Sequence, residues 1–345
     1  MTFLYIFLNI LFSVMIALLM IKLGKKVKPS ERCSHKNPTP TAGGLIFVTL
    51  FFINAFYFYG IGCYSLNPLL IAAFFWIAIV GFIDDQIHLS YKIRFIVQFI
   101  VALLVIQSGL KVSLPLLEGH PLWGFDYFLT ILLIIGLINA CNFFDGLNGL
   151  LAGSVLLLLL FSYFFISTDQ KTLIELLFIP LFIFYLFNYP NAKLFMGDTG
   201  STFLGLFLSV LALKNQQDYT FQTQTALIHK GLIYTLTPMM FCWFDVASTL
   251  IRRLLENRNI FTSWKDYLFH HLFDIGYSHK KIAIIYYNSI LLLCFLTYIL
   301  IYHSIPFGLV LLSYFVLQFT FFIYVMKRRS QIKHIVFEGN YTKQE

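Results

Sequence analysis

Charged residues are scarce in this chain of 345 residues. They make up 12% of it, whereas hydrophobic residues make up 59%. The resulting mean hydropathy of +0.79 lies far outside the range of soluble domains. The shortage of charge therefore excludes a soluble globular protein and indicates an integral membrane protein.

Cysteine is sparse as well, and so are the signals of secretion and of nucleic-acid binding. The five cysteines are scattered, odd in number and never in a C-x-x-C pair, which argues against a disulfide framework and against a zinc site. No basic residue precedes the first apolar run and no small-x-small cleavage site follows it, so we expect residues 3–21 to form a retained helix rather than a signal peptide. The net charge of +8 comes without a basic stripe interleaved with aromatic residues. Nucleic acid is therefore not an expected partner.

Long hydrophobic runs, by contrast, are abundant in this chain. Windows of about 17–22 apolar residues predict a membrane helix each. We count roughly eleven, and the sequence predicts an all-α polytopic membrane protein. The predicted spans are approximately 3–22, 43–60, 67–84, 93–110, 126–142, 150–167, 173–188, 201–214, 229–251, 282–302 and 306–326.

The distribution of lysine and arginine predicts the orientation of these spans. If the N-terminus lies outside, 20 of the 24 basic residues fall on the inner side, as the positive-inside rule expects. The prediction is therefore N-out and C-in. Neither an internal repeat nor a long linker stands out, so we expect one catalytic membrane domain over 1–326, with cytoplasmic loops, and a basic cytoplasmic tail over 327–345.

Acidic residues recur in the loops that this topology places inside. Asp84 and Asp85 end one span, Asp145 lies between two others, and Asp198 precedes a fourth. Each has a structural explanation, as a helix cap, a polar turn or a solvated loop. Three acidic inserts at the edge of the bilayer are nevertheless costly unless a cation neutralises them. A further polar element follows, with Asp245 near the inner end of the span 229–251.

The stretch 139–150 carries the densest of these patterns. Its polar side chains are spaced by three, so that on a helix they would lie along one side: Asn139, Asn142, Asp145 and Asn148. The pattern fits a polar turn between two spans, and it also fits a ligand site for a cation or a nucleotide.

Metal-assisted phosphoryl transfer is the chemistry that suits such an arrangement. Mg²⁺ takes oxygen ligands, usually one or two carboxylates together with phosphates and water. Asp198, flanked by glycines that let backbone approach phosphate, is the first choice of metal ligand. Asp84 and Asp85 would point about 100° apart on a helix, so we expect one to contact the metal or substrate and the other to orient a basic partner. Phe195 could present a ring for a nucleobase to stack on.

Two motifs resemble those of a known family. They are Asn142-Phe-x-Asp-Gly-x-x-Gly-Leu150 and Phe195-Met-Gly-Asp-x-Gly-Ser201. With Gly81-Phe-Ile-Asp-Asp85 they resemble the polyprenyl-phosphate N-acetylhexosamine-1-phosphate transferases of bacterial membranes, in order, from about Pro29 to Lys281. The segment Ser30-Glu31-Arg32 to Gly43-Gly44 and the segment Gly276-Tyr277-Ser278-His279 are most similar to the O-antigen-initiating branch.

The resemblance implies an enzyme that transfers a sugar 1-phosphate from a UDP-N-acetylhexosamine to undecaprenyl phosphate and releases UMP. It implies Mg²⁺ (or Mn²⁺) at Asp198, and catalytic roles for Asp84, Asp85 and Asp145. It also implies uracil stacking on Phe195. The remaining nucleotide or substrate contacts that we assign are Lys36, Thr41, Asn142, Asn148, Asn188, Lys193, Arg252, Arg253, His270 and His271.

The chain departs from the family's pattern at two places. Asn148 replaces a second acid, so it is expected to be a neutral contact. The first histidine of the family's loop motif is missing from Trp264 to His271, which leaves open whether His270 or His271 meets the pyrophosphate.

The sequence is compatible with more than one mechanism and with more than one class of protein. The acceptor phosphate is largely a dianion at neutral pH, which favours direct attack on the β-phosphate with Arg253 or Lys193 offsetting charge, although a covalent aspartyl-phosphate route stays open. The rival classes are a transporter of a lipid-linked or anionic substrate and a structural membrane subunit. The family indicates a bacterial inner (cytoplasmic) membrane location with the site facing the cytoplasm, and a homodimer.

Overall fold

The computed structural model describes residues 2–27, 38–113, 124–220, 232, 235–258, 266–303 and 307–341. In these residues it is built from α-helices, with one two-stranded antiparallel sheet formed by β1 (Lys26–Val27) and β2 (Thr39–Pro40). The chain divides into two compact units, Met1–Thr237 and Pro238–Glu345.

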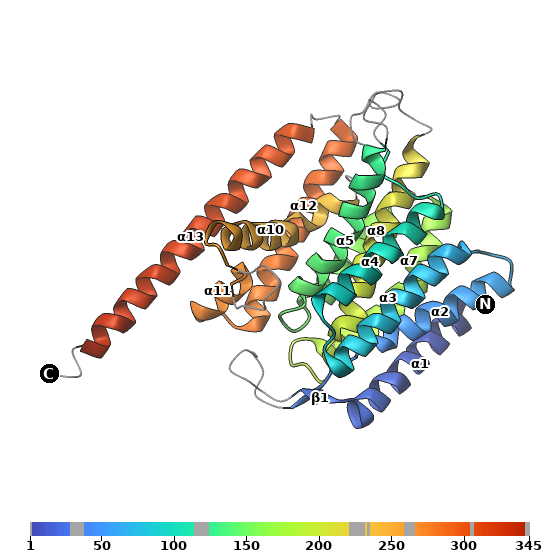
Figure 1. Cartoon of the computed structure of the whole chain (residues 1–345), viewed down its shortest axis with the longest axis horizontal. Coiled ribbons are helices and arrows are strands. Elements are labelled where there is room, and N and C mark those ends of the chain that lie inside the picture. Colours follow the sequence, from blue (N-terminus) through green and yellow to red (C-terminus); the bar gives the residue numbers. More distant parts are fainter. Residues whose placement is uncertain are drawn as a thin grey trace. The chain divides into compact units, whose positions relative to one another are not determined.

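Eight helices of the first unit are described over their length, in chain order. They are α1 (Thr2–Leu23), α2 (Leu45–Gly60), α3 (Pro68–Ile87), α4 (Tyr91–Gln107), α5 (Phe125–Phe144), α6 (Leu150–Tyr163), α7 (Thr168–Asn188) and α8 (Gly197–Thr220). Figure 1 shows the helices of this unit packed side by side. Helix α8 packs most extensively against α3 and α5, while α7 packs against α2, α6 and α1.

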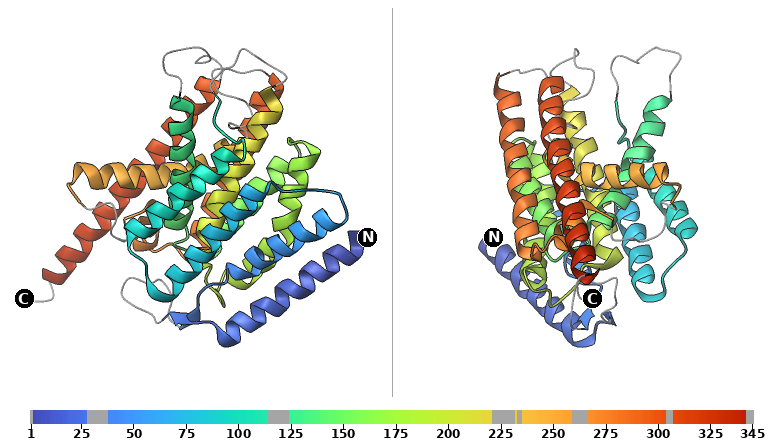
Figure 2. Two further views of the ribbon diagram at one scale, coloured as in Figure 1. Left: turned by 45° about the vertical axis from the view of Figure 1, so that its right-hand side comes forward. Right: turned by 90° about the vertical axis from the view of Figure 1, so that its left-hand side faces the viewer.

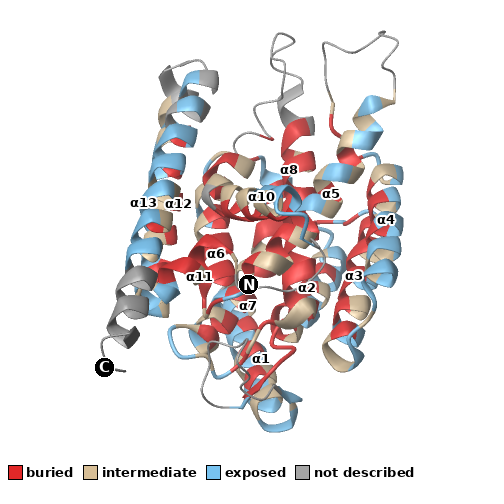
Figure 3. Ribbon diagram, turned by 60° about the vertical axis from the view of Figure 1, so that its left-hand side comes forward, coloured by how far each residue is buried: buried red, intermediate tan, exposed pale blue. Residues whose placement is uncertain are grey.

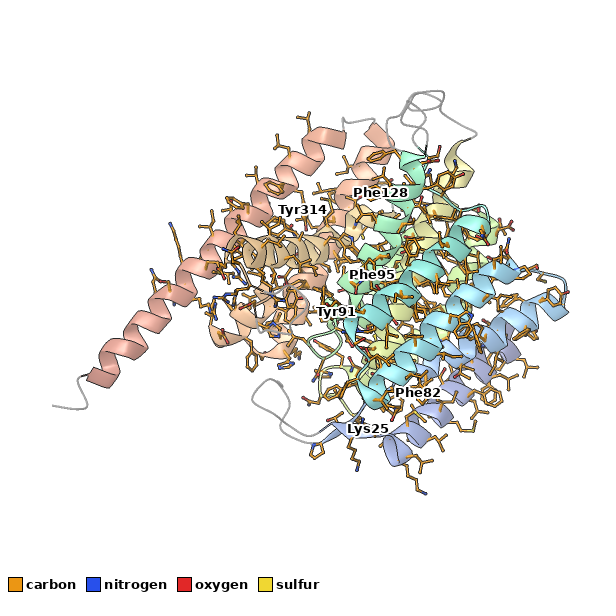
Figure 4. All side chains as sticks on the ribbon, viewed as in Figure 1. Lys25, Phe82, Tyr91, Phe95, Phe128 and Tyr314 are labelled. Carbon is orange, nitrogen blue, oxygen red and sulfur yellow. The ribbon has the colours of Figure 1, made fainter. Side chains whose placement is uncertain are left out.

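Helix α8 is the core of the first unit. Its residues 201–213 are buried, as Figure 3 shows, although each is part of an apolar sequence that could equally face lipid. The outer faces of α3 and α4 instead carry exposed aromatic side chains, including Phe82 and Phe95, which are labelled in Figure 4. In a membrane protein such a surface faces hydrocarbon, so burial within the protein distinguishes the central helix from its neighbours.

Local signals set where two site-bearing helices begin. Asn67 caps α3 by accepting a hydrogen bond from the Leu69 amide at 2.9 Å, and Pro68 occupies the first helical position. Ser90 caps α4 by accepting a hydrogen bond from the Ile93 amide at 3.4 Å. The short turn between α3 and α4 therefore follows directly after Asp84 and Asp85.

The second unit contains α10 (Met240–Leu255), preceded by a 3₁₀ turn at Thr237–Met239, then α11 (Leu268–Asp274), α12 (His279–His303) and α13 (Phe307–Tyr341). Within this unit α10 runs across the direction of α12 and α13 (Figures 1 and 2). The short α11 packs against both α12 and α13.

The chain is an all-helical polytopic membrane protein. Among the described residues, five helices are long and apolar enough to cross a bilayer: Phe3–Leu23, Pro68–Ile87, Phe125–Phe144, Thr168–Asn188 and His279–Ile299. Shorter apolar helices are Leu45–Gly60 and Leu150–Tyr163. The total of eleven spans and their orientation remain predictions.

The helices described at the span 229–251 and at the tail from 327 have other bounds than these segments, and the tail itself stays a prediction. The span expected over 229–251 includes residues outside the described ranges, and the described helix is α10, of 16 residues and amphipathic, with Arg252 and Arg253 in its last turn. The tail expected to begin at 327 continues α13 without a break to Tyr341. Basic residues end a hydrophobic run, but lysine and arginine are good helix formers, so the helix itself continues.

Candidate active site

The acidic residues singled out in the sequence come together at one end of the first unit. Asp84 and Asp85 lie at the end of α3, Asp145 follows the end of α5, and Asp198 is in the first turn of α8. Because α3 and α5 end where α8 begins, the antiparallel packing places all four acids at the same end.

Close backbone contact between α3 and α8 makes this possible. A Cβ atom added to Gly81 would lie 2.7 Å from the Asp198 carbonyl oxygen and 2.7 Å from Thr199 Cα. Only glycine leaves room for that approach, one turn before Asp84 and Asp85. The spacing within Gly-Phe-Ile-Asp-Asp thus has a steric reason.

Asp85 holds the first turn of α8. Its carboxylate accepts hydrogen bonds from the amides of Asp198 at 2.8 Å and Thr199 at 3.1 Å, and from Thr199 Oγ1 at 2.5 Å. This is the arrangement of a helix N-cap, but the capping residue comes from another helix. Asp85 therefore fixes the position of Asp198.

Asp84 and Asp198 share one arginine. The Arg94 guanidinium lies 3.1 Å from Asp84 Oδ2 and 3.4 Å from Asp198 Oδ2. Asp84 Oδ1 also accepts a hydrogen bond from the Leu89 amide at 2.5 Å. Arg94 was not among the residues assigned from sequence. The signal that could have found it is a basic residue in the first turn of the helix after an acidic pair.

Asn142 completes this constellation from α5. Its side-chain amide donates to Asp198 Oδ1 at 2.7 Å and to Ser201 Oγ at 3.1 Å. One turn earlier on the same helix, Asn139 exchanges hydrogen bonds with Gln98 of α4 at 2.7 and 3.3 Å. These amide contacts bind α4, α5 and α8 together behind the acidic residues.

Asp145 is placed differently from what the spacing by three predicted. Helix α5 ends at Phe144, so Asp145 is its C-cap residue and Asn148 lies in the following turn. Burial raises the pKa of Asp145 well above its ordinary value, and the neighbouring charges of Asp198 and Asp85 raise it further. The single polar helix face over all four residues was therefore wrong. Glycine and asparagine after Phe144 favour a turn over another helical turn.

Two loops beside the acids are joined by backbone hydrogen bonds. The amides of Gly43 and Gly44 donate to the carbonyls of Phe195 at 2.8 Å and Met196 at 2.9 Å, and the Phe195 amide donates to Pro40 at 2.8 Å. At Gly44 a side chain would collide with the backbone of Gly200. Thr41, an assigned contact residue, is buried within this pairing.

The other assigned residues of this unit have varied surroundings. Asn188 is buried. Its Oδ1 accepts a hydrogen bond from the Gly149 amide at 2.6 Å, and its Nδ2 donates one to the Leu194 carbonyl at 2.7 Å. Asn148 donates to the Pro190 carbonyl at 3.1 Å. Lys193 is exposed and Phe195 partly buried in the same loop, while Lys36 lies outside the described residues. Asn188 thus acts as a brace between two loops, and the ligand contacts of all five stay predictions.

The assigned residues of the second unit form a network of their own. Arg253 is 1% exposed and lies 3.5 Å from Asp266 Oδ2, with its guanidinium 5.5 Å from the ring centre of Tyr267. His271 is fully buried, and its Nε2 lies 3.0 Å from a guanidinium nitrogen of Arg252. Since a guanidinium can only donate, Nε2 accepts and the ring of His271 is neutral.

Exposure separates these four residues into two pairs. Arg252 and His270 are partly exposed, whereas Arg253 and His271 are buried. The exposed pair is available to a ligand, and the buried pair supports it. This difference was invisible in the sequence, where each partly exposed residue is adjacent to a buried residue of the same type.

The donor set fits Mg²⁺ only in combination with a substrate. Among the described residues, no three His, Cys, Asp or Glu side chains converge on a ready-made metal site. The cluster nevertheless offers carboxylate and amide oxygens, which are hard ligands. Because Mg²⁺ commonly keeps waters and substrate phosphates in its shell, one or two of these carboxylates suffice.

Comparisons with known proteins agree with this chemistry. The profile of glycosyl transferase family 4 matches residues 67–216. A probable undecaprenyl-phosphate N-acetylglucosaminyl 1-phosphate transferase of Bacillus subtilis is 34% identical over 278 residues, covering 77% of this chain and 75% of that protein.

More distant relatives extend the same pattern. An undecaprenyl-phosphate α-N-acetylglucosaminyl 1-phosphate transferase of Thermotoga maritima is 28% identical, over 72% of each chain. A phospho-N-acetylmuramoyl-pentapeptide-transferase of Fervidobacterium nodosum is 29% identical, over 76% of this chain and 84% of that protein. The interpretations as a transporter or a structural subunit are therefore set aside. The chain belongs to glycosyl transferase family 4, among the bacterial multi-pass enzymes that transfer sugar 1-phosphates to polyprenyl phosphates.

Proposed function

We propose that this protein transfers N-acetylhexosamine 1-phosphate from a UDP-sugar to undecaprenyl phosphate and releases UMP, as the first step of an envelope polysaccharide such as O-antigen. The names of the relatives favour N-acetylglucosamine as the sugar. The observation that carries the proposal is the meeting of Asp84, Arg94, Asn142 and Asp198 at one end of the helical bundle.

The reaction exchanges one phosphorus–oxygen bond for another. A phosphate oxygen of undecaprenyl phosphate attacks the β-phosphorus of the UDP-sugar, and the bond from that phosphorus to the bridging oxygen of UMP breaks. The acceptor is largely a dianion at neutral pH, so it attacks without a strong general base. Direct in-line attack therefore suffices, and no phosphorylated aspartate needs to form.

Asp198 and Asp145 are the residues that would hold Mg²⁺, and the side-chain NH2 of Asn142 orients the Asp198 carboxylate. Bound there, the ion would neutralise phosphate charge and stabilise the leaving UMP. Asp85 positions Asp198 through the first turn of α8. Arg94 offsets negative charge on the phosphates as they approach Asp84.

The substrate contacts are proposed from the same loops. Phe195 offers a ring to uracil, and the further nucleotide or substrate contacts that we propose are Lys36, Thr41, Asn148, Asn188 and Lys193. Arg252 and His270 of the second unit carry the exposed cationic and polar groups suited to pyrophosphate, with Arg253 and His271 behind them.

The predicted orientation supports a cytoplasmic site. With the N-terminus outside and the C-terminus inside, the acids face the cytoplasm, where UDP-sugars are made. We also propose about eleven spans, a single catalytic membrane domain over 1–326 and a homodimer. Cysteine labelling of Lys111→Cys and Lys193→Cys from either side of the membrane tests this orientation, since only the former should react from outside.

The decisive experiment measures UMP release by the purified protein with undecaprenyl phosphate, Mg²⁺ and a panel of UDP-sugars. We expect release with at least one UDP-N-acetylhexosamine, and a loss of release on adding a chelator. Absence of UMP with every sugar would contradict the proposed reaction. A phosphorylated enzyme trapped from UDP-sugar without the lipid would contradict direct attack.

A further inference from the structure

A cavity of about 510 Å³ lies in the first unit, between α1, α2, α6 and α7. Its floor includes Leu159 and Ile174, which are buried, and its rim includes Ile6, Tyr57 and Leu160, which are exposed. The lining is almost entirely aliphatic and aromatic. A volume of this size lies within the range of ligand pockets, and its walls would accept a hydrocarbon chain.

The cavity lies at the opposite end of the bundle from the acidic residues. It is lined by the last part of α2 and the first half of α7, whereas the site contacts the beginning of α2 and the end of α7. Along α7, Glu175 in the cavity is 13 residues from Asn188 at the site, or roughly 20 Å at 1.5 Å per residue. The cavity is therefore separate from the catalytic centre.

One acidic residue lies in this apolar lining. Glu175 is inside the membrane-span candidate Thr168–Asn188. Its Oε1 accepts a hydrogen bond from the Tyr163 hydroxyl at 2.8 Å, and its carbonyl accepts one from the Tyr5 hydroxyl at 3.1 Å. An ionisable residue within a span is costly and indicates a functional contact.

A cation lies one helical turn away from this carboxylate. Lys171 precedes Glu175 by four residues on α7, and its ammonium lies 5.3 Å from the centre of the Tyr163 ring. Tyr163 thus contacts both charged groups, its ring facing the lysine and its hydroxyl the glutamate. Tyr163 lines the cavity, and it therefore joins a carboxylate in the lining to a cation outside the lining that is one helical turn, roughly 5.4 Å of helix axis, away.

We propose that this cavity binds a zwitterionic phospholipid with a primary-amine headgroup, such as phosphatidylethanolamine. One acyl chain occupies the apolar cavity, the headgroup ammonium binds the Glu175 carboxylate, and the phosphate binds Lys171. Two carbons separate the amine from the phosphate ester in such a headgroup, which suits groups one helical turn apart. An anionic phospholipid offers no cation to Glu175, and a choline headgroup has no N–H to donate.

Native mass spectrometry of the purified, delipidated full chain tests this proposal with defined lipids. The titrants are phosphatidylethanolamine, phosphatidylcholine, phosphatidylglycerol and undecaprenyl phosphate, all with matched concentrations. We expect phosphatidylethanolamine to bind about tenfold more tightly than phosphatidylglycerol, because a charge-assisted hydrogen bond distinguishes them. Equal binding of these two lipids, or preferential binding of undecaprenyl phosphate at this cavity, overturns the proposal.

Substitutions at the two charged residues test the contacts of the lipid headgroup separately from those of the acyl chain. Glu175→Gln should abolish the preference for the amine headgroup, and Lys171→Met should weaken all the phospholipids. Lys22→Met, in the last turn of α1, is the matched control and should change neither result. Unaltered headgroup preference in Glu175→Gln contradicts the assignment.

The binding of the acyl chain is tested by filling the cavity with a larger side chain. Leu160→Trp places an indole at its rim, whereas Leu19→Trp changes a similarly exposed leucine of α1 outside it. Only the former should prevent phospholipid retention, with UMP release showing that both variants are folded. Retention of phospholipid by the Leu160→Trp variant overturns the proposal. If this variant instead loses the dimer while its lipid binding is unchanged, the cavity is occupied by a second copy of the chain, and the proposal is also overturned.

Discussion

Asp84, Asp145 and Asp198 of the first unit differ from the acidic residues Asp245 and Asp266 of the second unit in how protein groups match them. In the second unit, Asp245 is fully buried and receives hydrogen bonds from the Leu268 amide and the Tyr286 hydroxyl, each at 2.6 Å. Asp266 lies within 4.0 Å of three arginines. In the described part of the first unit, by contrast, Arg94 alone forms ion pairs with the acidic cluster, bridging Asp84 and Asp198.

This difference separates structural acids from those that need a ligand. A buried carboxylate that is matched by protein donors holds chain segments together, and removing it leaves those donors unsatisfied. Carboxylates that outnumber their cations repel one another, and a divalent ion with bound phosphate would compensate them. The acidic cluster of the first unit is therefore suited to bind a cation and phosphate, whereas the acidic residues of the second unit hold Arg252 and His270 in place.

The largest expected effect is that of Asp198→Asn. UMP release should fall by about 10²–10³-fold or more, because a group that stabilises transferring phosphate is lost. Thermal stability should change little, since the amide keeps its size and relieves repulsion with Asp84. Turnover assays and melting curves with and without Mg²⁺ test this. Continued turnover would remove Asp198 as the metal ligand.

Asp85→Ala should reduce both activity and stability. The change removes three hydrogen bonds from the first turn of α8, and loss of an N-cap typically costs about 1–2 kcal/mol. Activity should fall about 10²-fold because Asp198 is no longer held in place. Thr199→Val, which removes only the hydroxyl contact, serves as the milder control. An Asp85→Ala variant with wild-type melting would contradict the capping role.

Asp245→Ala should act on the second unit alone. The Leu268 amide and the Tyr286 hydroxyl would lose their acceptor, which we expect to destabilise this unit by about 1–3 kcal/mol. Hydrogen exchange should then increase in α11, while stabilisation by Mg²⁺ at the first unit persists. Loss of the Mg²⁺ response in this variant would show that the comparison between the two units is false. Tyr286→Phe removes one of the two contacts and should give a smaller effect.

The smallest effect is expected at the amide pair behind the site. Gln98→Leu breaks the reciprocal hydrogen bonds to Asn139 and should lower UMP release by no more than about tenfold, mainly by loosening α4 and hence Arg94. The KM for Mg²⁺ should stay constant. A loss as large as that of Asp198→Asn would place Gln98 in direct contact with substrate.

The sequence predicted which acidic residues belong to the candidate site, but it did not predict the different roles of neighbouring residues. Asp84 and Asp85 are adjacent, yet one pairs with Arg94 and the other caps a distant helix. Spacing by three suggested a helix through Asp145, but the helix ends at Phe144. In both cases the outcome depends on which backbone groups a separate helix presents, and local sequence carries no information about that.

Hydropathy and motif order alone determined that this is a polytopic helical membrane protein of a sugar-1-phosphate transferase family, because apolar runs of bilayer length have few alternatives in lipid. Tertiary structure decided that the apolar run 201–213 of α8 becomes the buried core, since an apolar run by itself does not determine whether it faces protein or lipid. It also decided which carboxylates are matched by donors and which are not. Those distinctions arise only when segments far apart in the chain approach within hydrogen-bonding distance.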